Sequence, residues 1–102
     1  MDIEFIQQKI RQRAYVIDPQ HILVLDKYGV TPEDIEQVIL TGEIIESYPH
    51  NLFLGFLSDG MPLHVACSYW ASKGLIYIHT VYIPDERWEP DYRTRRKGWK
   101  ER

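Results

Sequence analysis

The sequence predicts an α+β domain in which N-terminal helices pack on one face of a four-stranded antiparallel β-meander. Helix signals occupy the first 42 residues and hydrophobic patterns of period two occupy residues 43–83, with no alternation between them. The strand-like segments are separated by short turns, which join antiparallel neighbours. The 102 residues are enough for one core, so a single domain over 1–102 is expected.

The first helix is expected over residues 3–13. Asp2 precedes it as a candidate N-cap, because a carboxylate oxygen can accept hydrogen bonds from the free N–H groups of the first turn. Isoleucines recur on one side of this segment, as on the buried face of a helix. The string "YVI" at 15–17 then predicts a short extended stretch.

Two further helices are predicted before residue 43. Asp18 is a candidate N-cap and Pro19 suits the first helical position, so a helix is expected from there to Gly29. The segment "TPEDIEQVILTG", residues 31–42, gives the clearest helix signal. It has a threonine cap, a proline at the first position, two acidic residues that complement the helix dipole, and a closing glycine.

Four strands are predicted after residue 42, because the segments are rich in β-branched and aromatic residues and alternate in hydrophobicity. They are residues 43–48, 51–58, 62–70 and 75–83. Alternate residues of the third strand form a more apolar face, which is expected to pack under the helices. This face holds Leu63, Val65, Cys67 and Tyr69. Cys67 is therefore predicted to be a buried, unreactive thiol.

The opposite face of the sheet is predicted to be a polar and aromatic surface that can accept a nucleotide. It would hold His64, Ser68, Trp70, Thr80 and Tyr82. Two registers between the last two strands are open. One places His64 opposite Tyr82 and Cys67 opposite His79, and the other places His64 opposite Ile83. A one-residue slip exchanges the two faces of a strand.

Composition indicates a cytoplasmic protein. The 44% hydrophobic and 26% charged residues are ordinary for a globular chain. No apolar run reaches the roughly 20 residues that span a bilayer, so no membrane contact is expected. The acidic and polar N-terminus does not resemble a secretory signal. The single cysteine excludes an internal disulfide.

Charge is unevenly distributed along the chain. Residues 93–102 carry a net charge of +5, whereas the rest carries −8. Pro84 and Pro90 prevent one long helix, so a single turn near 86–89 and an irregular basic tail over about 91–102 are expected. The tail favours a nucleic-acid partner. It could instead bind the acidic body of a second copy, which would give a homodimer.

Four strings, taken in order, resemble the bacterial DUF4258 family, a family of domains of unknown function. They are "YVIDPQH", "GVTPEDIEQVILTGEIIESYP", "MPLHVA" and the most specific, "HTVYIPDERWEPDYRTRRK", so the resemblance runs from about Tyr15 to Arg96. This family is similar in fold to the RelE/ParE-like toxins, whose antiparallel sheet carries helices on one side. The resemblance implies a RelE-like toxin–antitoxin domain, an RNA endonuclease as one candidate activity, and a small zinc-finger antitoxin as a candidate partner.

The early helix departs from the family pattern. Family members often carry Ser-x-His-Ala followed by arginines there, whereas this chain reads "DPQHILVLDKYG". The net charge of −3 also opposes strong binding to phosphates. Both features favour an alternative function, a non-catalytic interaction or regulatory module of the same fold.

A metal-independent ribonuclease needs a base for the ribose 2′-hydroxyl, an acid for the leaving 5′-oxygen and cations for the phosphorane charge. With the resemblance, His64 and Tyr82 are the candidate catalytic residues, and Arg93, Arg95 and Arg96 are candidate RNA-binding cations. Without it, His64 is interpreted as a half-exposed strand histidine and Tyr82 as an aromatic at the sheet edge.

Tyr92 and Trp99 complete the predicted RNA-binding set, because aromatic rings interleaved with arginines hold single strands by stacking. Trp88 is instead expected to pack the C-terminal segment onto the sheet.

No metal site and no cofactor are predicted. The one short histidine–cysteine spacing, His64 to Cys67, places the two side chains on opposite faces of a strand. His79 is expected to be a satisfied core residue near Cys67.

Overall fold

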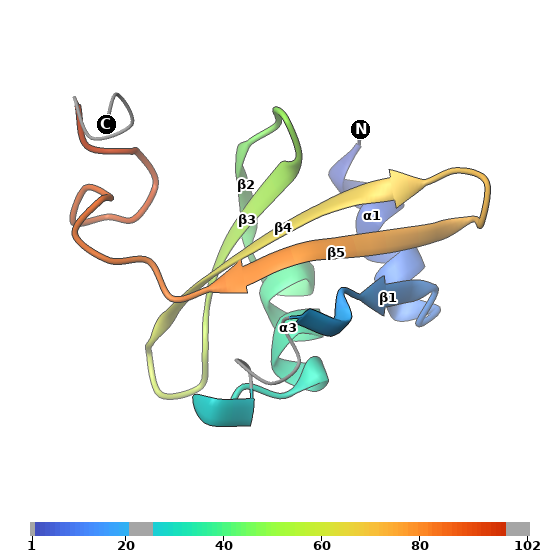
Figure 1. Cartoon of the computed structure of the whole chain (residues 1–102), viewed down its shortest axis with the longest axis horizontal. Coiled ribbons are helices and arrows are strands. Elements are labelled where there is room, and N and C mark those ends of the chain that lie inside the picture. Colours follow the sequence, from blue (N-terminus) through green and yellow to red (C-terminus); the bar gives the residue numbers. More distant parts are fainter. Residues whose placement is uncertain (1, 21–25, 98–102) are drawn as a thin grey trace.

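The computed structural model describes residues 2–20 and 26–97, and within them the chain forms two helices and one five-stranded mixed sheet. The helices are α1 (Ile3–Arg11) and α3 (Pro32–Thr41). The strands are β1 (Tyr15–Ile17), β2 (Glu43–Glu46), β3 (Asn51–Phe56), β4 (Pro62–Trp70) and β5 (Leu75–Tyr82), in the spatial order β1-β5-β4-β3-β2. Both helices lie on the same side of this sheet (Figure 1). The predicted α+β class is confirmed.

The observed sheet has one strand more than the predicted four-stranded antiparallel sheet. The stretch 15–17 is strand β1, which pairs in parallel with β5, with Tyr15 opposite Ile76 and Ile17 opposite Ile78. Three residues carry too little pattern to predict a strand, and their partner is distant in sequence. The pairing satisfies backbone groups that would otherwise lie at an open edge of β5. Strands β2 to β5 form the predicted antiparallel meander.

Both helices begin at their predicted caps. Asp2 Oδ1 accepts a hydrogen bond from the N–H of Glu4. Thr31 forms a reciprocal capping box with Asp34, which satisfies two free N–H groups of α3. These caps involve residues at most three positions apart, which is why local sequence predicts them.

The first predicted helix is shorter in the structure, and part of the second lies outside the described residues. α1 ends at Arg11, earlier than predicted, because Arg13 adopts the left-handed conformation with φ of 56°. Of the helix predicted from Asp18 to Gly29, residues 19–20 and 26–27 are helical, and residues 21–25 lie outside the described chain. No helix within the described ranges is both long enough and apolar enough to cross a bilayer.

The core lies between the helices and one face of the sheet. Its fully buried members include Ile6, Ile10, Ile35, Val38, Ile39, Phe53, Leu63, Val65, Cys67, Ile76 and Ile78. α3 approaches β3 closely at Gly55, where an added Cβ would lie 2.9 Å from Val38 Cγ1. The predicted inward face of β4 and the burial of Cys67 are confirmed. Burial raises the pKa of the Cys67 thiol to about 12.

A bulge decides the register between β4 and β5. His64 lies opposite Tyr82, as the first predicted register requires, but Cys67 pairs with Ile78 and not with His79. The bulge inserts one extra residue into β5, so the two halves of this strand pair follow different registers. His79 therefore points away from Cys67, and its predicted place in the core is wrong.

Residues 84–97, called the C-terminal segment below, form turns apart from one isolated bridge between Trp88 and Arg95. In Figure 1 the segment leaves the end of β5 as the orange and red loop. Trp88 is only 4% exposed, which confirms that it packs the segment onto the sheet.

Candidate functional site

His64 is fully buried, at 0% exposure, on the sheet face opposite the helices, called the open face below. The Trp88 ring of the C-terminal segment packs edge-on against its imidazole, with ring centroids 4.4 Å apart. The expectation of a His64 exposed on the open face is therefore wrong. The sequence predicts that Trp88 packs the C-terminal segment onto the sheet, but it does not indicate that the segment covers His64.

Both ring nitrogens of His64 have hydrogen-bond partners. Nε2 lies 2.9 Å from the backbone oxygen of Tyr92, and Nδ1 lies 3.0 Å from the Tyr82 hydroxyl. A carbonyl oxygen only accepts, so Nε2 donates to Tyr92 and, in the neutral ring, Nδ1 accepts from Tyr82. Burial lowers the pKa of His64, although the Tyr92 carbonyl acts in the opposite direction. His64 is thus a neutral imidazole held in one tautomer.

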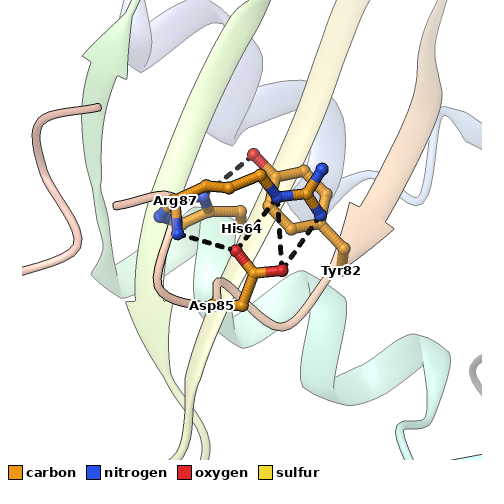
Figure 2. Close-up of polar contacts among 4 residues, drawn as sticks. All are labelled: His64, Tyr82, Asp85 and Arg87. Carbon is orange, nitrogen blue, oxygen red and sulfur yellow. Dashed lines mark hydrogen bonds and ion pairs between the residues drawn. The ribbon is translucent and has the colours of Figure 1, made fainter. Parts of the chain in front are cut away.

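Tyr82 connects this buried histidine to the surface. It is partly exposed and lines a pocket of about 390 Å³, called the Tyr82 pocket below. The other lining residues are Ile83, Asp85, Arg87, Trp88 and Arg95. Figure 2 shows the Tyr82–His64 contact together with the Arg87–Asp85 ion pair. Burial raises the pKa of Tyr82, so its hydroxyl stays protonated at neutral pH.

Two of the predicted RNA-binding arginines bind carboxylates of β2. Arg93 pairs with Glu43, and Arg95 pairs with Glu46 at 2.9 Å between Nε and Oε2. The Arg95 guanidinium also lies 4.6 Å from the centroid of the Trp88 ring. These pairs reduce the charge that the segment presents to an anion.

The other predicted RNA-binding residues are placed differently. Arg96 donates from Nε to the Trp88 carbonyl at 3.2 Å and is otherwise exposed. Tyr92 contributes its backbone carbonyl to His64 and adopts a left-handed conformation with φ of 63°. Trp99 lies outside the described residues.

A second polar cluster, which sequence reasoning missed, lies further along the open face. His79 Nε2 is 2.6 Å from Ser68 Oγ, and its ring stacks on His50 with centroids 4.0 Å apart. Burial lowers the pKa of His79, and the neighbouring His50 lowers it further. The cluster depends on the β5 bulge and on a histidine from the β2–β3 connection, so no local pattern could have revealed it.

The geometry of the Tyr82–His64 pair allows it to accept a proton from a ligand. Because the Tyr82 hydrogen points to His64, its oxygen presents only acceptor sites to the pocket. A ligand hydroxyl bound there could transfer a proton to Tyr82 while Tyr82 passes its own proton to Nδ1 of His64. Within the described ranges, no group of three or more His, Cys, Asp or Glu residues is placed to hold a metal ion.

The fold and site define a small α+β domain whose polar pocket is built jointly by β5 and the C-terminal segment. A family model described as a domain of unknown function, DUF4258, matches residues 22–83, more than half of the chain. The chain belongs to this family. It matches no curated protein and no solved structure.

The family match ends within the region that the sequence resemblance spans. Residues 22–83 include both His64 and Tyr82 but not the C-terminal segment. Most of the string "HTVYIPDERWEPDYRTRRK" therefore lies outside the matched residues. The pocket thus combines residues inside the family match with residues beyond it.

Proposed function

We propose that this chain is a toxin–antitoxin-type domain with a RelE-like fold that binds single-stranded RNA at the Tyr82 pocket. The helices on one face of a largely antiparallel sheet agree with the fold expected for that class. One observation carries the proposal: a protonated Tyr82, held by a buried His64, shares a pocket with the guanidinium groups of Arg87 and Arg95. Guanidinium groups suit phosphate because they offer several donors in a planar fork.

The RNA-endonuclease form of the proposal assigns His64 as a base that acts through Tyr82. The ribose 2′-hydroxyl gives its proton to the Tyr82 oxygen, and the Tyr82 proton moves to Nδ1 of His64. The 2′-oxygen then forms a bond to phosphorus, the bond from phosphorus to the 5′-oxygen breaks, and water protonates the leaving oxygen. Tyr82 is not free to act as the acid, because its proton is directed at His64. The lowered pKa of His64 opposes the transfer, so slow cleavage is expected.

A second candidate function is a non-catalytic interaction module of the same fold. It is favoured by the pairing of Arg93 with Glu43 and of Arg95 with Glu46. An RNA phosphate would have to displace a carboxylate of the chain itself to reach these arginines. A small zinc-finger antitoxin or a second copy of this chain are its candidate partners.

Salt-dependent RNA binding separates the two candidates. The purified chain, free of any antitoxin, is titrated with a labelled single-stranded RNA at several salt concentrations. Replacing Arg87 and Arg95 by alanine should weaken binding and make the slope of log K against log salt shallower by about 0.7 for each phosphate that the variant no longer neutralises. Arg11→Ala, an exposed cation on α1, is the matched control.

Cleavage is then tested with Tyr82→Phe. This variant should bind RNA as the wild type does but lose cleavage, because the relay between RNA and His64 is removed. RNA binding without cleavage in the wild type would leave the RNA-binding proposal in place and refute the endonuclease form. Undetectable binding at low salt would refute RNA binding and favour the interaction module.

A further inference from the structure

A row of aromatic rings extends the open face from the Tyr82 pocket towards the β4–β5 turn. Neighbouring ring centroids are 5.6 Å apart from Trp70 to Tyr77, 4.8 Å from Tyr77 to His79 and 4.0 Å from His79 to His50. Trp70, at the far end, is 40% exposed. None of these rings takes part in the relay or the phosphate binding proposed above.

Two shallow hollows accompany the row. The first has a volume of about 270 Å³ and is lined by Ser68, Tyr69, Trp70, Tyr77 and His79. The second, of about 190 Å³, includes His50 and shares Tyr82 and Arg95 with the Tyr82 pocket. The row is therefore continuous with the end of the open face where Arg95 could meet a phosphate.

The polar groups along the row suit a nucleobase better than an apolar ligand. The Ser68 hydroxyl and the His79 imidazole, which are hydrogen-bonded to each other, line the first hollow together with Trp70. The ammonium group of Lys73 lies 5.8 Å from the centroid of the Trp70 ring, where it could meet a backbone phosphate. A nucleotide has a flat base that can stack on an aromatic ring and polar groups at the edge of the base that can form hydrogen bonds. It also has a phosphate that can pair with an ammonium group.

We propose that Trp70, Tyr77 and His79 form a base-stacking subsite for single-stranded RNA. The strand would run along β4 and β5 from the Tyr82 pocket to Trp70. A β-strand rises about 3.3 Å per residue, so the distance from His64 to Trp70 is about 20 Å, which several nucleotides of an extended strand cover. Because every base has a π-face, such a subsite tolerates many sequences but requires bases. This inference rests on the proposed function and specifies its substrate as base-bearing single strands.

The test compares two oligonucleotides, a labelled single-stranded RNA and a matched strand of the same length that lacks its bases. Affinity is measured by fluorescence anisotropy at low salt for the wild type, Trp70→Ala, Trp70→Phe and Phe5→Ala. Phe5 is a matched control, because it is 38% exposed but lies on α1, where its ring packs edge-on against Tyr69 and not against a ring of the proposed subsite. Thermal unfolding of each variant shows that the fold is intact.

Trp70→Ala should bind the base-bearing RNA roughly 5- to 150-fold more weakly, the range expected when one stacked base loses its platform. It should bind the strand without bases as the wild type does. Trp70→Phe should recover most of the affinity, and Phe5→Ala should lose none.

Two results would overturn the subsite while leaving RNA binding standing: unchanged affinity of Trp70→Ala for the base-bearing RNA, or a folded Trp70→Phe as weak as Trp70→Ala. A wild-type chain that binds neither strand would overturn the proposed function as well.

Discussion

The two faces of the sheet are covered in different ways. On one face, α1 and α3 bury a continuous set of apolar side chains around Phe53 and Val65. On the open face, the C-terminal segment covers His64 with an indole ring and a backbone carbonyl. The first cover consists of regular helices, and the second is irregular and polar.

Covering a sheet face with apolar helices and covering it with a polar segment have different physical requirements. Apolar burial is non-directional and scales with the area removed from water. A buried histidine needs its partners at defined positions, since a polar group left without one costs about 1–3 kcal/mol. Across the described part of the chain, every buried side-chain nitrogen or oxygen has a hydrogen-bond partner. The helix-covered face should therefore carry most of the stability, and the open face should respond to pH and salt.

The largest effect is expected on the helix-covered face. Phe53→Ala should lower the free energy of unfolding by about 3–5 kcal/mol, because it removes a fully buried ring and leaves a cavity. Phe56→Ala, on the same strand but 51% exposed, should change it by no more than about 0.5 kcal/mol. Urea unfolding measures both. Equal losses would contradict the assignment of this face as the main core.

Two tryptophan substitutions test whether the C-terminal segment packs on the open face. Trp88→Ala should lower the free energy of unfolding by about 3 kcal/mol, because it removes a ring that is 4% exposed and admits water to His64. Trp70→Ala, at 40% exposure, should stay within about 0.5 kcal/mol. Thermal and urea unfolding compare the two. If the tryptophans proved equivalent, the C-terminal segment would not be packed in solution.

Acid should weaken the open face more than the helix-covered one. His64 and His79 have folded pKa values below their unfolded value of about 6.5, so the unfolded chain takes up protons first. Their stabilising contribution is complete above that value and is lost as the pH falls towards the folded pKa, by up to about 1.4 kcal/mol per pH unit for the buried His64 and by less for the partly exposed His79.

The matched variant is His64→Gln, whose neutral amide can both donate and accept but does not titrate. It should make the free energy of unfolding less dependent on pH below about 6.5. Unfolding curves across this range measure the slope. An unaltered slope would show that His64 is not the neutral buried group described above.

The smallest effect is expected for the ion pairs that attach the C-terminal segment to β2. The Arg95 and Glu46 side chains are 47% and 27% exposed, so their coupling should be about 0.2–1 kcal/mol and should decrease with added salt. A double-mutant cycle with Arg95→Ala and Glu46→Gln, measured at low and high salt, gives this energy. The Arg87–Asp85 pair serves as the more exposed reference. A coupling that salt does not change would indicate a dry, buried contact instead.

Features that depend on neighbouring residues can be predicted from the sequence alone. The capping box of Thr31 with Asp34, the strand pattern of residues 62–70 and the inward direction of Cys67 all follow from side chains a few positions apart. The packing of Trp88 onto the sheet is also expected from the sequence, and the ring is 4% exposed. Three of the four predicted meander strands end a residue or more earlier than their patterns do, because hydrogen-bond pairing sets the ends of strands.

Features that join residues distant in sequence depend on the packing of the whole fold. The parallel pairing of β1 with β5, the bulge that turns His79 towards Ser68, and the cover over His64 each need partners from separate parts of the chain. The same holds for the pairing of Arg95 with Glu46, which attaches one residue of the basic tail to β2. A sequence pattern reports the propensity of one segment and the direction of its side chains. Which residues meet depends on how the packed elements place them, and in this protein that placement determines whether His64 is exposed.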